Sequence, residues 1–492
     1  MGPLPALAPI VARRLLGTRA DWRMRRPAPP GRPVVGRPLV GPVLLIAAAG
    51  AGWFAFDDTV GEESTAALAL LVGSVSILLM AWSNVLATRW RPLEPWFGGL
   101  DRMYRWHRWF GAVSVGAMWL HVQIVDDVKG IPGASRDVAH TAEDLAGTAE
   151  TMLYVLVAVS LLRWVPYRWW RLTHKALVVP YALACWHFYT ATKPYGNGSP
   201  WGRWFSALMV LGLVAWLYRV VWCDVVRRGV PYRVAAIDQV GSTTTIDLEP
   251  AGARHLRHRP GQFAFLKPQV RGMSEPHPFT IASGPDDDLL RFHVRDLGDW
   301  SQRLPERVRV GDRVLVEGPY GRLEPAPSSL DGHPPKGPVV WIAGGVGITP
   351  FLGALSSPER TGDRAPHLFH AVRTRDDAPA LDDVLAAAAD GRIVHHLHVS
   401  GEGTRLGRSD LEAVFGSGGL RDAHVVMCGP DRLVRDMTAA VRSLGAHHVH
   451  VEAFDIRTGV GPDLSRELAD QASRRRSTST PAPSSPSAHA AK

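Results

Sequence analysis

Hydrophobic residues gather in the first half of the chain, and polar residues dominate the second half. The first half contains six apolar runs, most of them close to the roughly 20 residues that a helix needs to cross a bilayer. They cover residues 39–56, 65–88, 106–125, 147–164, 174–192 and 203–223. The second run is the clearest, and the fourth and sixth are short. This pattern predicts a six-helix transmembrane bundle over residues 39–225, preceded by a basic, disordered cytosolic arm over residues 1–38.

Basic residues fall on alternate loops between these runs, and they orient the bundle. One set of loops holds Arg89, Arg91, Arg102, Arg105, Arg108, Arg163, Arg168, Arg171, Lys175, Arg227 and Arg228. The other set is acidic or neutral, and its longest member covers about 126–146. Because basic loops stay in the cytosol, both termini are expected there, in a protein of the cell membrane. The net charge of +9 therefore fits a lipid surface better than nucleic acid.

The second half changes to short alternating strands separated by Gly and Pro, which predicts an antiparallel β-barrel domain over residues 230–328. Strand and helix patterns then alternate over 336–457, as in an α/β Rossmann-like nucleotide-binding domain. Residues 458–492 form a Ser-, Pro- and Ala-rich tail that we expect to be disordered. The cysteines Cys185, Cys223 and Cys428 are far apart and suggest neither disulfides nor a thiolate metal site.

Four histidines lie in two of the apolar runs. His107 and His121 are fourteen residues apart, which places them about 21 Å apart and about 40° out of line on one helix face. His174 and His187 are thirteen apart and fall on different faces of an ideal helix, unless Pro180 bends it. A single histidine here would be explained equally well by a helix–helix hydrogen bond or an interfacial position. Four ionisable groups at membrane depth favour a functional role.

The third and fifth runs point the same way across the membrane, so His107 pairs with His174 and His121 with His187. Two cross-helix pairs at different depths are what bis-histidine ligation of two haems requires. Zinc would need three or four ligands that converge on one point. Since the chain has no CxxCH motif, the haems would be b-type.

These features resemble the ferric reductase and NADPH oxidase superfamily, whose members carry paired histidines on the third and fifth of six helices. The segment "GGLDRMYRWHRWFG" is similar to that family too. In the second half, "PGQFAFL", "HPFTIAS", "VRDLGDWSQRL" and "EGPYGRL" resemble the flavin barrel of ferredoxin reductases in order and spacing. The resemblance implies that four residues line the isoalloxazine ring: His277, Pro278, Phe279 and Thr280. It places four more near the flavin phosphates: Arg295, Gly298, Trp300 and Ser301.

A glycine-rich turn, "VVWIAGGVGITPFL", joins a buried strand to a helix and suits a pyrophosphate. It resembles the "GGxGxTP" turn of ferredoxin-reductase-type nicotinamide domains, which implies a site made by Gly344, Gly345, Gly347, Thr349 and Pro350. By the same resemblance Cys428 and Gly429 approach the nicotinamide. Arg373 and Arg375 suit a ribose 2′-phosphate and favour NADPH, although a solvated loop and NADH stay open. Phe454 resembles the family's flavin-shielding aromatic, but here the chain continues beyond it.

Together these expectations describe a transmembrane oxidoreductase with FAD and two b-type haems. Electrons would pass from cytosolic NADPH to a small extracytoplasmic acceptor, most simply a ferric or other metal chelate. Reduction of dioxygen to superoxide is one alternative, and an electron-carrier subunit serving a membrane partner is another. A transporter that uses histidines as a proton relay would leave the flavin and nicotinamide motifs without a purpose. No catalytic side chain beyond the cofactors is expected.

Overall fold

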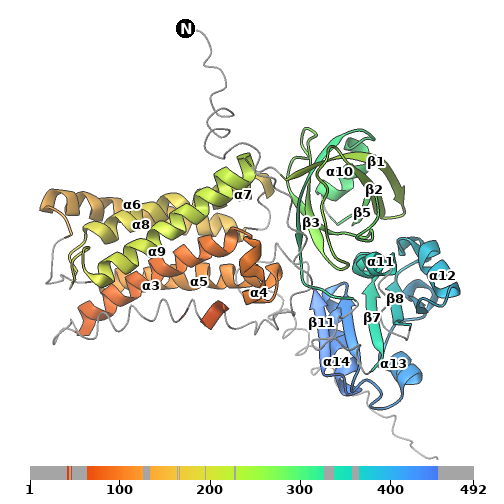
Figure 1. Cartoon of the computed structure of the whole chain (residues 1–492). Helices are drawn as coiled ribbons and strands as arrows, with labels where there is room; N and C mark the ends of the chain where they lie inside the picture. The colour runs from red at the N-terminus through yellow and green to blue at the C-terminus, as the bar shows by residue number, and fades with distance from the viewer. Residues whose placement is uncertain are drawn as a thin grey trace, which may run out of the picture.

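The computed structural model describes residues 41–43, 46, 64–125, 133–162, 165, 167–193, 195–226, 229–297, 299–325, 337–356 and 365–452. Within these ranges the chain forms a helix bundle, a β-barrel domain and an α/β domain, arranged in chain order (Figure 1). The bundle lies at one end of the molecule and both soluble domains lie at the other. The predicted arm, the tail, Phe454 and nearly all of the first apolar run lie outside the described residues.

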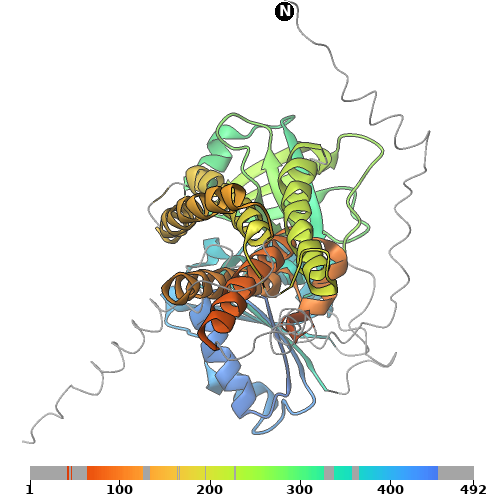
Figure 2. The ribbon, with the colours of Figure 1, turned by 90° about the vertical axis from the view of Figure 1, so that its left-hand side faces the viewer.

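The bundle consists of long helices that run roughly side by side (Figure 2). Its elements are α3 (Ser64–Ala87), η1 (Arg91–Leu93), α4 (Glu94–Phe97), α5 (Leu100–Ile124), α6 (Arg136–Leu161), α7 (Tyr167–Lys175), α8 (Val178–Thr190), α9 (Pro200–Leu217) and the π-helical η2 (Tyr218–Val226). Three helical stretches in the described part are long and apolar enough to cross a membrane: Leu68–Ala87, Arg136–Leu161 and Pro200–Val225. Helix α5 packs between its neighbours but is rich in arginine, histidine and tryptophan.

The structure changes three expectations about the apolar runs. The fourth helix begins at Arg136, well before its apolar part, because the preceding Ala-, Glu- and Thr-containing residues are compatible with helix. The segment expected as the longest outer loop, about 126–146, is therefore partly helical. The sixth run is not short, since η2 extends α9 to Val226. The fifth run is two helices, α7 and α8, so that a count of six single spans is not confirmed.

The division of the fifth run explains how His174 and His187 can be used together. Helix α7 ends at Lys175 and α8 begins at Val178, so the two histidines belong to different helices. Pro180 is the third residue of α8, where a missing backbone N–H needs no partner within the helix. The proline thus lies in the first turn of a helix and does not bend one. Because the helix is interrupted, the direction of the His187 side chain is not set by the helical position of His174.

The barrel domain is one antiparallel six-stranded sheet with the order β4-β3-β6-β1-β2-β5. Its strands are β1 (Val230–Val240), β2 (Thr243–Pro250), β3 (Phe263–Pro268), β4 (His277–Thr280), β5 (Leu290–Arg295) and β6 (Arg313–Tyr320), and α10 (Asp299–Arg307) packs against it. The edge strands share no ladder among the described residues, but the N–H of Ala282, after β4, donates to Arg291 of β5 at 2.8 Å. The sheet is therefore a partly closed barrel rather than a complete one.

The last domain is a parallel five-stranded sheet with the order β11-β10-β7-β8-β9, as the alternating pattern predicts. The strands are β7 (Val339–Gly344), β8 (His367–Val372), β9 (Val394–Val399), β10 (His424–Cys428) and β11 (His448–Glu452). The helices are α11 (Thr349–Leu355), α12 (Leu381–Ala389), α13 (Arg408–Phe415) and α14 (Asp431–Ser443), joined by the short η3 (Gly345–Ile348), η4 (Arg375–Asp377) and η5 (Ser400–Glu402). The central strands β7 and β10 are buried, as strands covered on both faces must be.

Phe292 lies at the centre of the barrel core and is fully buried. Replacing it with alanine should lower the stability of the barrel by about 3–5 kcal/mol, because it removes buried apolar contacts and leaves a cavity. The melting temperature of the detergent-solubilised full chain measures this. Val310→Ala, at a side chain that is 64% exposed, is the matched control and should change the melting temperature little. Equal shifts in both variants would contradict the assignment of this core.

Candidate functional site: two histidine pairs, a flavin strand and a nucleotide turn

The first histidine pair joins α5 to α7. The ring centres of His107 and His174 are 5.8 Å apart, and the ring of His174 stacks on Trp170 at 5.0 Å. The Nδ1 atom of His107 lies 2.9 Å from the carbonyl oxygen of Ser83 on α3. Since a carbonyl only accepts, Nδ1 carries the proton and Nε2 is left with its lone pair.

The second pair joins α5 to α8, and its α5 member again bonds to a carbonyl of α3. His121 donates from Nδ1 to the carbonyl oxygen of Ala69 at 2.8 Å. A Cβ added at Gly73 of α3 would lie 2.8 Å from that same nitrogen, so a glycine makes room for the imidazole. His187 is close enough to His121 for their charges to interact, and its buried Nδ1 has no hydrogen-bond partner among the described residues.

A pair of serines fixes the register of α3 against α5 midway between the two levels. The hydroxyl of Ser76 donates to the carbonyl of Ser114 at 2.8 Å, and Ser114 returns the same bond to Ser76 at 2.8 Å. Each contact is seven residues from the next on both helices, which is two helical turns. The two histidine levels are therefore set by one regular antiparallel helix pair.

These positions fit haem ligation. Histidines that bind a metal usually donate their other ring N–H to a carbonyl or carboxylate, as His107 and His121 do. With ring centres 5.8 Å apart, His107 and His174 would be able to hold one metal ion between them, because a bond from a metal to an imidazole nitrogen is about 2.0 Å long. No group of three or more His, Cys, Asp or Glu side chains converges on a metal position in the described ranges.

The expected flavin residues gather around β4. His277 and Phe279 lie against Trp300 of α10, with ring centres 4.3 Å and 5.6 Å away. Thr280 is buried at the end of the strand, and Pro278 is half-buried. Trp300 is itself buried and donates from its indole to Met273 O at 3.2 Å, so it supports the strand from within the core.

The expected phosphate residues lie at the start of α10 and at the end of β5. Ser301 accepts the backbone N–H of Leu297 at 3.0 Å, which closes the loop before the helix. Gly298 lies outside the described residues. A Cβ added at Gly345 would lie 3.1 Å from the guanidinium of Arg295. Arg295 therefore stands where the flavin domain meets the nucleotide turn, and the two expected sites adjoin.

The nucleotide turn is shaped by glycines at two strand ends. A Cβ at Gly347 would lie 2.3 Å from the carbonyl oxygen of Cys428, and one at Gly429 would lie 3.0 Å from Gly344. Gly345 has a φ of +54°, in the left-handed region. Thr349 donates to Val346 O at 3.0 Å as α11 begins, and Pro350 is buried in its first turn. The turn thus brings the expected residues at the ends of β7 and β10 together.

The two arginines expected near the ribose lie at the end of β8, on the edge of the sheet where such folds bind ligands. Arg375 pairs with Glu402 at 3.2 Å, and both side chains are more than half exposed. The carbonyl of Arg373 accepts the N–H of Gly401 at 2.9 Å. Ser242 of the barrel domain donates to Asp377 at 2.8 Å and ties this loop to the flavin domain.

His370 is a residue of the site that the sequence analysis missed. It lies in the middle of β8, is fully buried, and its Nε2 is 3.2 Å from the carbonyl oxygen of Gly345. Burial lowers the pKa of His370 to about 4, so it stays neutral and donates to the turn. A histidine inside an otherwise apolar buried strand, "HLFHAV", was the available signal.

Comparison with known proteins agrees with this division of the chain. Residues 72–185 match the family described as ferric reductase like transmembrane component, residues 234–324 match an FAD-binding domain, and residues 341–439 match an oxidoreductase NAD-binding domain. The fold and the matches define a ferric reductase-like transmembrane domain joined to a flavin and nicotinamide module. These three matches confirm the resemblance to ferric reductases and NADPH oxidases that the motifs predict.

The relatives include a flavohemoprotein of Chromobacterium violaceum, 29% identical over 46% of this chain and 61% of its own length. Respiratory burst oxidase homolog protein A of Arabidopsis thaliana is 25% identical over 61% of this chain and 34% of its own. Human dual oxidase 1 is 33% identical over 23% of this chain and 8% of its own. The chain thus spans less than two thirds of these relatives. Among solved structures, a cytochrome P450 reductase of Amycolatopsis is 25% identical over 46% of this chain and 70% of its own, with a TM-score of 0.41.

Gly347→Ala should weaken the binding of NADP⁺ by at least about tenfold, because the new Cβ would overlap the carbonyl of Cys428 and force the turn open. Isothermal titration of the full chain with NADP⁺ measures the dissociation constant. Gly252→Ala, where an added Cβ meets no atom within 4 Å, is the control and should bind like the wild type. Unchanged affinity in Gly347→Ala would show that the nucleotide binds elsewhere.

The soluble domains should lose stability as the pH falls from 6.5 toward 4. Burial lowers the pKa of His293 and of His370 to about 4, and burial together with Arg171 does the same for His277. In this window the unfolded chain binds protons that the folded chain does not, which costs about 1.4 kcal/mol per histidine per pH unit. The melting temperature should therefore be lower at pH 5.5 than at pH 7.5. His293→Gln should reduce this dependence; a melting temperature independent of pH would refute it.

Proposed function

We propose that this chain is a transmembrane oxidoreductase that takes electrons from cytosolic NADPH and delivers them, through FAD and two b-type haems, to a small extracytoplasmic acceptor. The observation that carries the proposal is that the nucleotide turn, the flavin strand and the two histidine pairs follow one another in this order. Arg295 joins the nucleotide turn to the flavin domain, and the flavin strand β4 is close enough to Arg171 of α7 for His277 to be affected by its charge. Helix α7 carries His174, and the second histidine pair follows deeper in the bundle.

The residues of the chain would bind and orient rather than react. Bound FAD would supply the step from a hydride donor to single electrons, and the haems would supply one-electron carriers. The glycine turn and the start of α11 would hold a pyrophosphate. His370 donates a hydrogen bond to the carbonyl of Gly345 and would stabilise the conformation of the turn. Cys428, which is buried at the end of β10, would border the nicotinamide.

The haem sites would use all four histidines, and His107 and His121 would bind through Nε2 because Nδ1 is hydrogen-bonded. His107 and His174 would hold the haem nearer the flavin, and His121 and His187 the one nearer the outside. The four imidazoles would hold the haems, and the haems would supply one-electron reduction of the acceptor. The positively charged loops, together with the soluble domains that follow the bundle, support a cytosolic position for both termini.

A ferric or other metal chelate is our first choice of acceptor. The polar beginning of α6 presents Asp137, His140, Glu143 and Asp144, and His140 lies 3.5 Å from Glu143 at an exposed position. Such side chains suit a cationic or metal-bearing substrate. Dioxygen is the second candidate, and the relationship to a respiratory burst oxidase homologue and to a dual oxidase supports it.

The purified full chain should contain about two haems, and anaerobic NADPH should reduce both. His187→Ala should remove the outer haem and leave one, with the reduction of flavin by NADPH unchanged, because His187 is far from the flavin strand along the bundle. Absorption spectra before and after NADPH measure this, and air or a ferric chelate then identifies the acceptor. His140→Ala, at an exposed histidine, is the control and should retain both haems.

A preparation without haem would overturn the proposal, and so would haem that dithionite reduces but NADPH does not. Loss of flavin reduction in His187→Ala would contradict the separate roles given to the two halves of the chain.

A further inference from the structure

The bundle and the barrel domain share one apolar core. Phe263 and Phe265 of β3 and Tyr320 of β6 pack into a single buried cluster with bundle residues, namely Leu79, Leu86, Phe97, Leu100, Met103 and Phe110. In Figure 1, β3 lies on the side of the barrel that faces the bundle. The two domains are therefore joined by a continuous buried apolar cluster.

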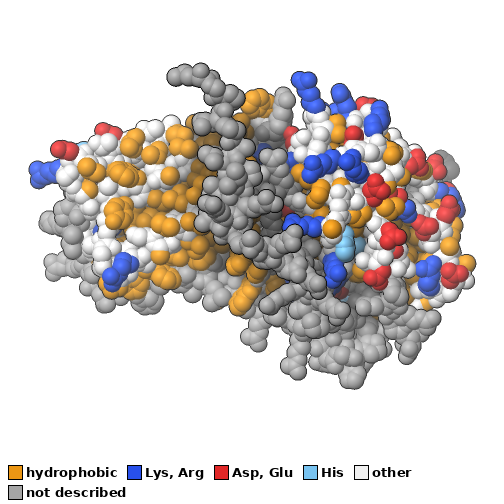
Figure 3. Space-filling view, turned by 45° about the horizontal axis from the view of Figure 1, so that its top comes forward, with side chains coloured by type: hydrophobic (Ala, Val, Ile, Leu, Met, Phe, Trp, Pro, Cys, Tyr) orange, Lys and Arg blue, Asp and Glu red, His pale blue; other side chains and the backbone are white. Residues whose placement is uncertain are grey.

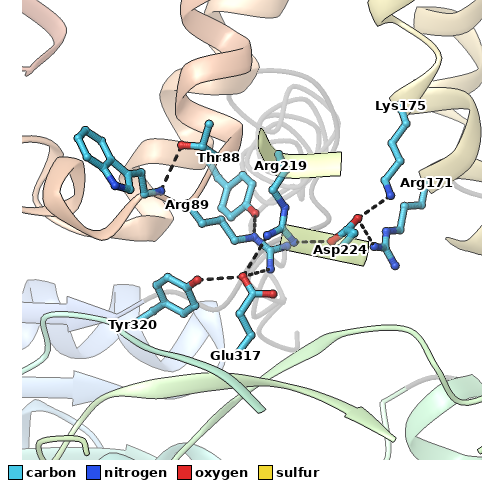
Figure 4. A network of polar contacts seen from close by, with 10 residues as sticks. Thr88, Arg89, Arg171, Lys175, Arg219, Asp224, Glu317 and Tyr320 are labelled. Carbon is cyan, nitrogen blue, oxygen red and sulfur yellow. Dashed lines mark hydrogen bonds and ion pairs between the residues drawn. The ribbon is translucent and has the colours of Figure 1, made fainter. Parts of the chain in front are cut away.

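A half-buried carboxylate lies next to this core. Glu317 of β6 accepts hydrogen bonds from Arg219 at 3.0 Å and from the hydroxyl of Tyr320 at 2.9 Å, and it lies 3.8 Å from Arg89 (Figure 4). Burial pushes the pKa of Glu317 upward, but Arg89 and Arg219 outweigh burial and hold that pKa below its usual value. Glu317 is therefore a charged group that bundle residues neutralise.

Arg219 continues the network to a second carboxylate. It lies 3.2 Å from Asp224, which also pairs with Arg171 at 2.9 Å and with Lys175 at 2.6 Å (Figure 4). Arg219 and Asp224 both belong to the π-helical η2, and π-helical turns frequently mark functional positions. The barrel is thus connected through η2 to α7, the helix that carries His174.

Arg89 makes further contacts at the interface between the bundle and the barrel, which we call the seam. It has a φ of +56°, and its guanidinium lies 3.7 Å above the ring of Phe265 while its Nε donates to the hydroxyl of Tyr104. Close by, the backbone N–H of Gly321 donates to the buried carboxylate of Glu94 at 2.8 Å. Strand β6 is therefore fixed to the bundle at Glu317, and the residue that follows the strand, Gly321, is fixed to it as well.

The charge balance makes Glu317 the sensitive member of this network. Four cations, Arg89, Arg171, Lys175 and Arg219, surround two carboxylates. Without the charge of Glu317, Arg89 and Arg219 would lie at the interface between the bundle and the barrel with Asp224 as the remaining carboxylate of the network. Uncompensated charges that are shielded from water are costly, so the seam would open or shift.

We infer that Glu317 is a positioning residue which, through Arg89 and Arg219, sets the placement of the flavin domain against the His107/His174 pair and so governs electron transfer from flavin to the inner haem. Strand β6 pairs with β3, and β3 pairs with the flavin strand β4, so a shift of β6 moves the flavin site. The inference rests on the proposed function. It does not involve the nucleotide turn, which contacts the barrel elsewhere.

The test is Glu317→Gln in the full-length holoprotein, followed by anaerobic stopped-flow mixing with NADPH. Flavin reduction should stay within about twofold of wild type, whereas haem reduction should slow by at least about tenfold, because small displacements of reacting groups carry large rate penalties. The content of FAD and of haem should not change. Glu412→Gln, which removes an exposed carboxylate paired with Arg408, is the matched control and should match wild type in both steps.

Two further measurements separate positioning from a general structural role. Amide hydrogen exchange should become faster in β3 and β6 of Glu317→Gln but not in β7 and β8. Arg219→Gln should slow haem reduction as well. The double variant Arg219→Gln/Glu317→Gln should be slowed by less than the product of the two single effects, because the two variants remove the same Glu317–Arg219 contact.

Haem reduction at the wild-type rate in Glu317→Gln would overturn the inference, and so would an equal slowing of flavin and haem reduction. A wild-type chain that holds no haem would overturn the proposed function instead. In that case the exchange measurement alone decides whether Glu317 holds the barrel on the bundle, and unchanged exchange would refute it.

Discussion

Two of the four histidines inside the apolar bundle, His107 and His121, depend on the backbone of α3. An imidazole away from water needs a partner for its N–H, and α3 supplies carbonyl oxygens at Ser83 and Ala69, one for each level. The reciprocal bonds of Ser76 and Ser114 keep those carbonyls opposite the right histidines. A one-residue slip of α3 against α5 would leave both rings without an acceptor and would move both proposed haem sites at once.

Much of this arrangement could be predicted because it follows from residue spacings and patterns that repeat over short stretches of the sequence. The fourteen-residue spacing of His107 and His121 places them on one face of one helix, and both do contact α3. The alternation of polar and apolar residues in the barrel, and of strands and helices after it, predicts both sheets. The relation of His174 to His187 could not be predicted in this way, since it depends on a helix break at residues 176–177.

What the sequence did not reveal depends on partners that are distant in the chain. Glu317 is an ordinary strand residue until Arg89 and Arg219 approach it, and Gly321 meets Glu94 across 227 positions. His370 has a role only because β8 places it under the turn that ends β7. Hydrophobic periodicity carries no information about such pairs, because a buried polar residue only weakens the local pattern.

The apolar core shared by the bundle and the barrel has a consequence for biosynthesis. The ribosome makes the helices before it makes β3 and β6, and segments made first generally fold first. Phe263, Phe265 and Tyr320 therefore emerge beside a surface that is already in place in the bilayer. The flavin domain therefore packs against a helix surface that has already formed. If proteolysis or separate expression removed the bundle, the soluble half would carry an exposed aromatic patch, the kind of surface that promotes aggregation.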